Sequence, residues 1–162
     1  MRIENADVPD FIDIVRKLFR EYEAHIKVDL CFQGFEKELA GLPGEYARPS
    51  GRLLLAFDGD VVAGCGALRR VEDKVCEMKR LYVRAEHQGK SIGAALARVL
   101  IEQASEAGYA WMRLDTMPSM QKAIALYRSI GFKEISAYRF NPVPGALFLE
   151  LELAEAHFAR KS

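Results

Sequence analysis

The segment from Cys76 to Ala107 constrains the fold of this chain more than any other. An apolar strand pattern comes first, a polar loop follows over residues 84–88, and a turn over residues 89–93 leads directly into a helix. The helix is predicted by apolar residues on one face, at Ile92, Ala95, Leu96, Val99, Leu100 and Ala104. Because the first N–H groups of a helix have no intrahelical partner and the helix dipole is positive there, the turn predicts an anion-binding site.

The strand in this segment changes its side-chain alternation part-way along. Cys76 and Met78 lie on one parity, whereas Leu81 and Val83 lie on the other. One interpretation is a β-bulge near residues 79–80, a feature that often lies beside active sites. The other is a strand buried on both faces, in which alternation carries little information. The pattern alone favours neither interpretation.

Composition narrows the class of protein. A chain of 162 residues, 50% of them hydrophobic, predicts one domain over residues 1–162. Lys+Arg and Asp+Glu both total 23, and the net charge of +0 argues against a nucleic-acid partner. No stretch approaches the ~18 apolar residues of a membrane span, and the polar N-terminus does not resemble a signal peptide. The scattered cysteines Cys31, Cys65 and Cys76 predict reduced, partly buried thiols in a cytoplasmic protein.

Periodicity and turn residues predict the other elements. One helix is expected to start with Asp7 as its N-cap and Pro9 in its first turn, and a second helix is expected over residues 32–40. A later helix is predicted from Pro118 to Gly131. Strands are predicted over residues 52–57, 61–69, from 76 onward, 111–116, 132–140 and 147–153. The order predicts an α/β (α+β) protein with a mixed sheet, in which strand 111–116 lies parallel to the strand from Cys76.

Two phosphate-binding motifs can be rejected for the glycine-containing turn. The nucleoside-triphosphatase loop requires a glycine five residues before Gly89, where this chain has Arg84. A dinucleotide fingerprint requires three glycines, and this turn has only Gly89 and Gly93. On its own, the turn is compatible both with a plain connection and with an anion site.

Two motifs taken together resemble the GNAT superfamily of N-acetyltransferases. Residues 88–93, Gln-Gly-Lys-Ser-Ile-Gly, are similar to the family's [Q/R]-x-x-G-x-[G/A] pyrophosphate loop, with Ser91 in place of the central glycine. Residues 123–132 are similar to the family's A-x-x-L-Y-x-x-x-G-F segment, although Met120 stands where an asparagine is common. A left-handed conformation at Ser91 would be unfavourable if the turn requires one.

The resemblance implies a fold and a cofactor. The fold would be a mostly antiparallel sheet of about seven strands and about four helices, with the fourth and fifth strands parallel and splayed. Acetyl-CoA would lie in that splay, with its pyrophosphate on the turn and its pantetheine arm along the fourth strand. An amide near Leu81 or Val83 would polarise the thioester carbonyl. The implied cofactor-binding residues are Leu81, Tyr82, Val83, Gln88, Gly89, Lys90, Ser91, Ile92, Gly93 and Ala94.

The resemblance also implies two catalytic residues. An amine with a reference pKa of ~10.4 must lose a proton before it attacks, and the departing thiolate must gain one. Glu77 is similar to the glutamate that some members use as general base, directly or through water, and its alternative is a solvated strand glutamate paired with Lys79 or Arg80. Tyr127 matches the tyrosine that protonates the sulfur, and its alternative is a core aromatic.

The predicted function is transfer of an acetyl group to a primary amine by direct attack in a ternary complex. The alternative is a catalytically silent CoA-binding module. Glu21, Glu23, His25 and Asp29 are candidates for an acceptor pocket, which residues 141–145 could close, but the acceptor itself, a small molecule or a peptide, is open. No metal is expected, because the histidines His25, His87 and His157 lack ligand spacing. An edge strand in the C-terminal half leaves a homodimer open.

Overall fold

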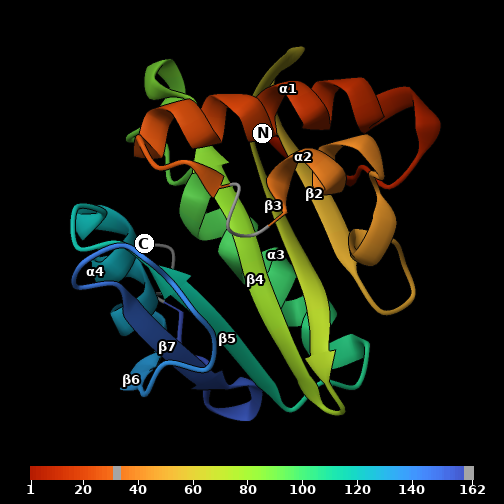
Figure 1. Ribbon diagram of the computed structural model, residues 1–162. Helices are drawn as coiled ribbons and strands as arrows, with labels where there is room; N and C mark the ends of the chain where they lie inside the picture. The colour runs from red at the N-terminus through yellow and green to blue at the C-terminus, as the bar shows by residue number, and fades with distance from the viewer. Residues whose placement is uncertain (31–33, 159–162) are drawn as a thin grey trace.

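The computed structural model of the protein describes residues 1–30 and 34–158. A seven-stranded sheet with the order β1-β2-β3-β4-β5-β7-β6 forms its centre (Figure 1). Neighbouring strands are antiparallel except for the parallel pair β4–β5, as predicted. The strands are β1 Arg2–Asn5, β2 Arg52–Asp58, β3 Val61–Glu72, β4 Val75–Val83, β5 Trp111–Thr116, β6 Lys133–Ile135 and β7 Leu147–Glu152.

Helices cover both faces of the sheet. Helices α1 and α2 lie on one face, and α3 and α4 lie on the other (Figure 1). The bounds are α1 Pro9–Ile26, α2 Phe35–Ala40, α3 Ile92–Glu106 and α4 Gln121–Ile130, with short 3₁₀ turns at Gly44–Tyr46, Ala85–His87 and Leu153–Glu155. The mixed α/β architecture predicted from the sequence is therefore confirmed.

Strand β2 shows why the sheet separates two cores. Alternate residues of a strand point to opposite faces. Leu53 and Leu55 therefore pack with Phe19 of α1, whereas Leu54 packs with Leu96 of α3. All of these side chains are almost completely buried, so the strand is apolar along most of its length.

The β-bulge in β4 is confirmed. Lys79 pairs with Ala67 and Tyr82 pairs with Cys65, so the two residues between Lys79 and Tyr82 lie opposite a single residue of β3. Arg80 has a φ of 61°, which is uncommon for a residue other than glycine. The bulge explains the parity change in the sequence, because one extra residue reverses the alternation that follows it.

Strands β4 and β5 pair only at their beginnings. The parallel ladder joins Val75–Glu77 to residues 111–113 and then stops. Beyond Glu77 the two strands diverge, as the ribbon shows (Figure 1). The edge of β4 that faces β5 therefore lacks a strand partner from residue 78 onward, and the backbone groups on this edge are available to a ligand.

Several predicted boundaries at the N-terminal end were wrong. Strand β1 was missed, because it has only four residues and no apolar alternation. The N-cap of α1 is Val8 and not Asp7, whose carboxylate instead accepts hydrogen bonds from the backbone and side chain of Arg48. Helix α2 begins at Phe35, and the part of its prediction over residues 32–33 lies outside the described residues.

Two boundaries in the C-terminal part were also wrong. Helix α4 begins at Gln121 with Met120 as its N-cap, because residues 117–120 form a turn after β5. Strand β6 covers only residues 133–135 of the predicted segment 132–140, since only these residues pair with β7. The helix stop at Gly131 is confirmed, and its φ of 122° shows why glycine suits that position.

Candidate functional site

The turn before α3 presents unpaired backbone donors. The first bond of this helix runs from the Ala95 N–H to the Ser91 carbonyl at 3.1 Å. Across the described residues, the N–H groups of residues 89–94 bond to no backbone acceptor outside the helices and strands. Gly89 and Ser91 have φ values of 83° and 61°, so the turn does require the left-handed conformation at Ser91. These donors can bind an anion at the positive end of the helix dipole.

Side chains beside this turn already have partners in the protein. Lys90 Nζ lies 2.7 Å from Asp58 Oδ2, and His87 Nδ1 lies 3.1 Å from the same oxygen. Hydrogen bonds from these two residues hold the pKa of Asp58 below its ordinary value. Gln88 Nε2 donates to the Val83 carbonyl at 3.2 Å. An anion on the turn would therefore be bound mainly by backbone N–H groups.

The end of β4 connects this turn to the opening between the strands. The Arg84 N–H donates to Ala63 of β3 at 2.8 Å. Because N–H groups alternate in direction along a strand, the N–H of Val83 points to the opposite edge, toward the opening. A Cβ on Gly93 would lie 3.6 Å from Val83 Cγ2, so the start of α3 lies directly against the end of β4.

A cavity lies where β4 and β5 diverge. Its walls come from α1, the connection that follows it, the bulge of β4, the end of β5, the start of α4 and the loop before β7. It is lined by Tyr22, Leu30, Met78, Lys79, Arg80, Leu81, Leu114, Asp115, Thr116, Met117, Met120, Tyr127 and Asn141. Leu81 lines the cavity, and residues 82–88 lead along the chain from Leu81 to the turn before α3.

Tyr127 lines this cavity from α4. Its side chain is almost completely buried, with its ring centroid 5.6 Å from that of Phe132. Burial and the neighbouring Tyr22 raise the pKa of Tyr127 well above its ordinary value, so the phenol holds its proton at neutral pH. No hydrogen-bond partner for its hydroxyl occurs among the residues that the structure describes. Tyr127 therefore brings a protonated phenol to the wall of the cavity.

Glu77 lies beside the cavity but does not line it. The residue is fully buried, and Arg69 Nε donates to its Oε1 at 3.0 Å. Its Oε2 accepts a hydrogen bond from the hydroxyl of Tyr138 and lies 3.3 Å from Arg139 Nη2. Both carboxylate oxygens are therefore engaged, so proton transfer to Glu77 would have to pass through Tyr138 or a water molecule.

The bulge places two consecutive basic residues in the cavity wall. Arg80 donates two hydrogen bonds to the carboxylate of Glu38, at 3.0 and 2.9 Å. Lys79 has no such partner among the described residues. Burial and the neighbouring Arg80 lower the pKa of Lys79 to about 7, although Glu77 and Glu38 oppose the shift. Neither basic residue was singled out from the sequence as a functional group, and the predicted bulge was the only signal that could have indicated them.

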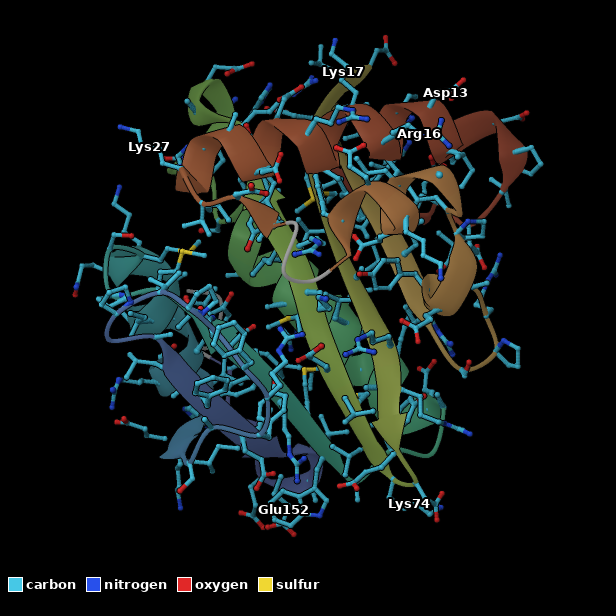
Figure 2. The ribbon with its side chains drawn as sticks, viewed as in Figure 1. Asp13, Arg16, Lys17, Lys27, Lys74 and Glu152 are labelled. Atoms are coloured by element: carbon cyan, nitrogen blue, oxygen red, sulfur yellow. The ribbon has the colours of Figure 1, made fainter. Side chains whose placement is uncertain are left out.

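The N-terminal candidates do not line the cavity. Glu21 pairs with Arg84 at 2.7 Å, Glu23 accepts from the Leu30 N–H, and the His25 ring lies against Tyr82. Asp29 also has an interaction of its own. The same region instead contributes Tyr22 and Leu30, and Asn141 contributes from the loop predicted to close the other side. Asp13 and Lys17 lie on the outer side of α1 (Figure 2), whereas Arg16 donates to the Leu39 carbonyl of α2 at 3.1 Å.

Cysteines do not supply a nucleophile in the described site. Cys65 and Cys76 are buried free thiols, and burial raises the pKa of both, for Cys76 to about 12. Cys31 lies outside the described residues.

Within residues 1–30 and 34–158, no three His, Cys, Asp or Glu side chains are grouped to hold a metal ion. In the same part of the chain, no helix combines the length and apolar character needed to cross a membrane.

Comparison with known proteins identifies the family. Residues 10–132 match the model of the acetyltransferase (GNAT) family. An uncharacterised N-acetyltransferase of Schizosaccharomyces pombe is 36% identical over 155 residues, which cover 94% of this chain and 95% of the relative. N-acetylaspartate synthetase of Mus musculus is 32% identical over 123 residues, covering 75% of this chain and 40% of that protein.

Solved structures share the fold. A GNAT-family acetyltransferase from Staphylococcus aureus has a TM-score of 0.77 at 19% identity, covering 94% of this chain and 98% of its own. An acetyltransferase from Salmonella typhimurium, solved with its cofactor acetyl-CoA, has a TM-score of 0.66 at 21% identity, covering 94% and 93%. The chain belongs to the GNAT family of acetyltransferases, and it is an acyltransferase.

Proposed function

We propose that this protein transfers the acetyl group of acetyl-CoA to a primary amine, by direct attack within a ternary complex. The observation that carries the proposal is the continuity between two features. Unpaired N–H groups at residues 89–94 form an anion site, and the backbone of residues 81–83 runs from it to a cavity that Leu81 and Tyr127 line. One elongated molecule with phosphates at one end and a thioester at the other would occupy both.

The turn before α3 can bind a diphosphate better than a single charged side chain could, because it offers several N–H donors. Gly89, Ser91 and Gly93 leave the backbone accessible, and the N–H groups of a helix start are directed outward together. In this pose the residues that bind the cofactor are those implied by the family motif: Leu81, Tyr82, Val83, Gln88, Gly89, Lys90, Ser91, Ile92, Gly93 and Ala94. Lys90 would offset phosphate charge while it remains paired with Asp58.

The acyl group would lie near the bulge of β4. An N–H on the free edge of this strand, at Val83 or Leu81, would donate to the thioester carbonyl and stabilise the negative charge that develops on its oxygen. The amine nitrogen forms a bond to the carbonyl carbon while the carbon–sulfur bond breaks. The proton of Tyr127 passes to the sulfur, which leaves as the thiol. The acylated nitrogen then loses its extra proton to give the amide, and transfer of a proton back to Tyr127 restores the phenol.

The amine must be neutral before it attacks. We assign the proton transfer to Glu77 acting indirectly, through the hydroxyl of Tyr138 or through water, because both oxygens of Glu77 are engaged by neighbours. Arg69 and Arg139 also lie on either side of this carboxylate, 3.0 and 3.3 Å from its oxygens. The residue therefore suits a proton relay better than a direct contact with the acceptor.

The test is a screen of amines with acetyl-CoA, read by release of free thiol and by mass of the product. We expect turnover with at least one primary amine and binding of acetyl-CoA in its absence. A catalytically silent CoA-binding module would instead bind acetyl-CoA without releasing thiol for any amine. The unpaired hydroxyl of Tyr127 at the cavity favours the enzyme, since a binding module needs no proton donor there.

A further inference from the structure

The cavity contains one buried cation without a counter-ion. Lys79 is 9% exposed and lines the cavity from the bulge. It forms no ion pair within 4.0 Å with any described residue, whereas each of the other buried basic groups beside it has one. An unpaired charge in such a place is costly, because burial removes most of its hydration.

The nearby carboxylates are already engaged by arginines. Glu38 is bonded by Arg80, and Glu77 is bonded by Arg69 and lies close to Arg139. Asp115, which lines the cavity, accepts from Arg139 at 2.6 Å and from Asn141 at 2.9 Å. The four basic side chains Lys79, Arg80, Arg69 and Arg139 thus surround three buried or half-buried carboxylates, on Glu38, Glu77 and Asp115. The rim residue Glu45, 3.4 Å from Arg69, is 72% exposed and screened by solvent.

A second donor in this cluster also lacks an acceptor. Arg139 Nε is buried and has no hydrogen-bond partner. Leaving a buried donor unpaired carries a desolvation cost that a bound acceptor oxygen would remove. Arg139 does not line the cavity, so its unpaired donor shows only that the cluster is short of acceptor atoms. Lys79 is the unpaired group that an anion in the cavity could reach.

We propose that Lys79 binds a carboxylate of the acceptor, so that the acetylated amine belongs to a molecule that is also an acid, such as an amino acid. The inference rests on the proposed acetyl transfer and adds the chemical class of the acceptor. Lys79 would hold the acid at the cavity wall while the amine faces the thioester. Its role is recognition, and it takes no part in the proton transfers.

The acid–base behaviour of Lys79 supports this role. Burial and Arg80 lower its pKa to about 7, while Glu77 and Glu38 oppose the change and Arg139 adds to it. A bound carboxylate would favour the charged form and raise this pKa again. Acceptor binding above pH 7 should therefore take up a proton. If Lys79 were instead the general base, its replacement would slow the reaction of every amine alike, whether or not the amine carries a carboxylate.

The experiment compares matched acceptors that differ only in charge. L-amino acids, their carboxamides and the corresponding simple amines would be measured at pH 6.5 and 8.5, by thiol release for kcat and KM and by calorimetry for binding. We expect the acid to have a KM at least about tenfold below that of its amide, and calorimetry in buffers of different ionisation enthalpy to show proton uptake at pH 8.5.

Lys79→Met should remove the preference for the acid and leave kcat for the amide and the affinity for acetyl-CoA within about twofold. Lys79→Arg should restore part of the preference, and Lys133→Met, an exposed lysine on β6, serves as the control that keeps it. Equal KM for acid and amide in the wild type, or equal loss of kcat for both in Lys79→Met, would overturn the proposal. Preferential binding of the acid without any thiol release would support the carboxylate site and reject the acetyl transfer.

Discussion

Arg80 and Glu38 form a two-hydrogen-bond ion pair that joins the bulge of β4 to helix α2. The guanidinium donates Nε and Nη2 to the two carboxylate oxygens at 3.0 and 2.9 Å. The side chains are only 2% and 15% exposed, and the Arg80 guanidinium lies 5.2 Å from the centroid of the Phe35 ring. Because Arg80 is the left-handed residue of the bulge, this pair stabilises the conformation that also places Lys79 in the cavity wall.

Glu38→Gln should destabilise the protein by about 3 kcal/mol, because it leaves a buried arginine without its counter-ion. Burial opposes ionisation of Glu38, but hydrogen bonds and charge from Arg80 outweigh it and hold its pKa below the ordinary value. The contribution is therefore complete above pH 4.5 and declines as the pH falls through the lowered value. Urea unfolding at pH 7 and pH 3.5 measures it, and Glu36→Gln, in an exposed pair with Arg20, should change stability by less than about 0.5 kcal/mol.

Tyr127→Phe should lower kcat by about 10²-fold and leave the affinity for acetyl-CoA nearly unchanged, since it removes only the proton donor. Steady-state kinetics and titration calorimetry measure the two quantities. Tyr109→Phe is the matched control: this buried tyrosine bonds to the Ser50 carbonyl at 2.6 Å and does not line the cavity. It should cost about 1 kcal/mol of stability without lowering kcat. Unchanged turnover in Tyr127→Phe would show that the residue serves only in packing.

Gly89→Val should weaken acetyl-CoA binding by at least about tenfold, because a β-branched residue is strained at a φ of 83° and would disturb the phosphate turn. Gly108→Val is a suitable control. Its φ is 95°, its Cβ would also meet open space, and it follows the other end of α3. Both variants should lose similar stability in thermal unfolding, whereas calorimetry should find weaker acetyl-CoA binding only for Gly89→Val. Equal affinities would contradict the assignment of the turn.

Lys79→Met should stabilise the protein in the absence of acceptor by about 2–4 kcal/mol at pH 6 and by much less at pH 9.5. The pKa of Lys79 is lowered from 10.5 to about 7 on folding, so the folded state binds fewer protons than the unfolded state between these values. The free energy of unfolding of the wild type therefore rises with pH across that window. The rise is about 1.36 kcal/mol for each unit by which the pKa differs between the two states. Urea unfolding at the two pH values measures the difference, which Lys133→Met should not show.

Local patterns in the sequence predicted much of the framework. The turn at residues 89–93 followed by an apolar helical stripe predicted α3, and strand β5 was placed at its observed bounds. The parity change after Met78 left a bulge and a strand buried on both faces equally open, and the structure has both the bulge and a run of buried residues over positions 75–80. The helix that connects the two strands predicted that β4 and β5 are parallel, and the family motifs implied that this pair is splayed.

Local sequence patterns did not predict the shortest strand or the N-terminal cap of α1. Strand β1 has four residues, and its pairing with β2 rather than its own sequence makes it a strand. Asp7 was a reasonable N-cap by residue type, but Arg48, 41 residues away, competes successfully for its carboxylate. Such competition is decided by which side chains the fold brings together.

The sequence alone determined the backbone framework of the site: a helix start with unpaired donors, a strand leading to it, and a tyrosine on a later helix. The spacing of apolar residues and the preferences of turn residues depend on only a few neighbouring positions, so both can be recognised in a short segment of sequence. Only the tertiary structure decided which charges meet. The contacts of Arg80 with Glu38 and of Tyr138 with Glu77 join residues 42 and 61 positions apart. Lys79 is left without a partner because the neighbouring carboxylates are already bonded to other side chains. In a low-dielectric interior these bonds are strong, so the carboxylates are not free to pair with Lys79.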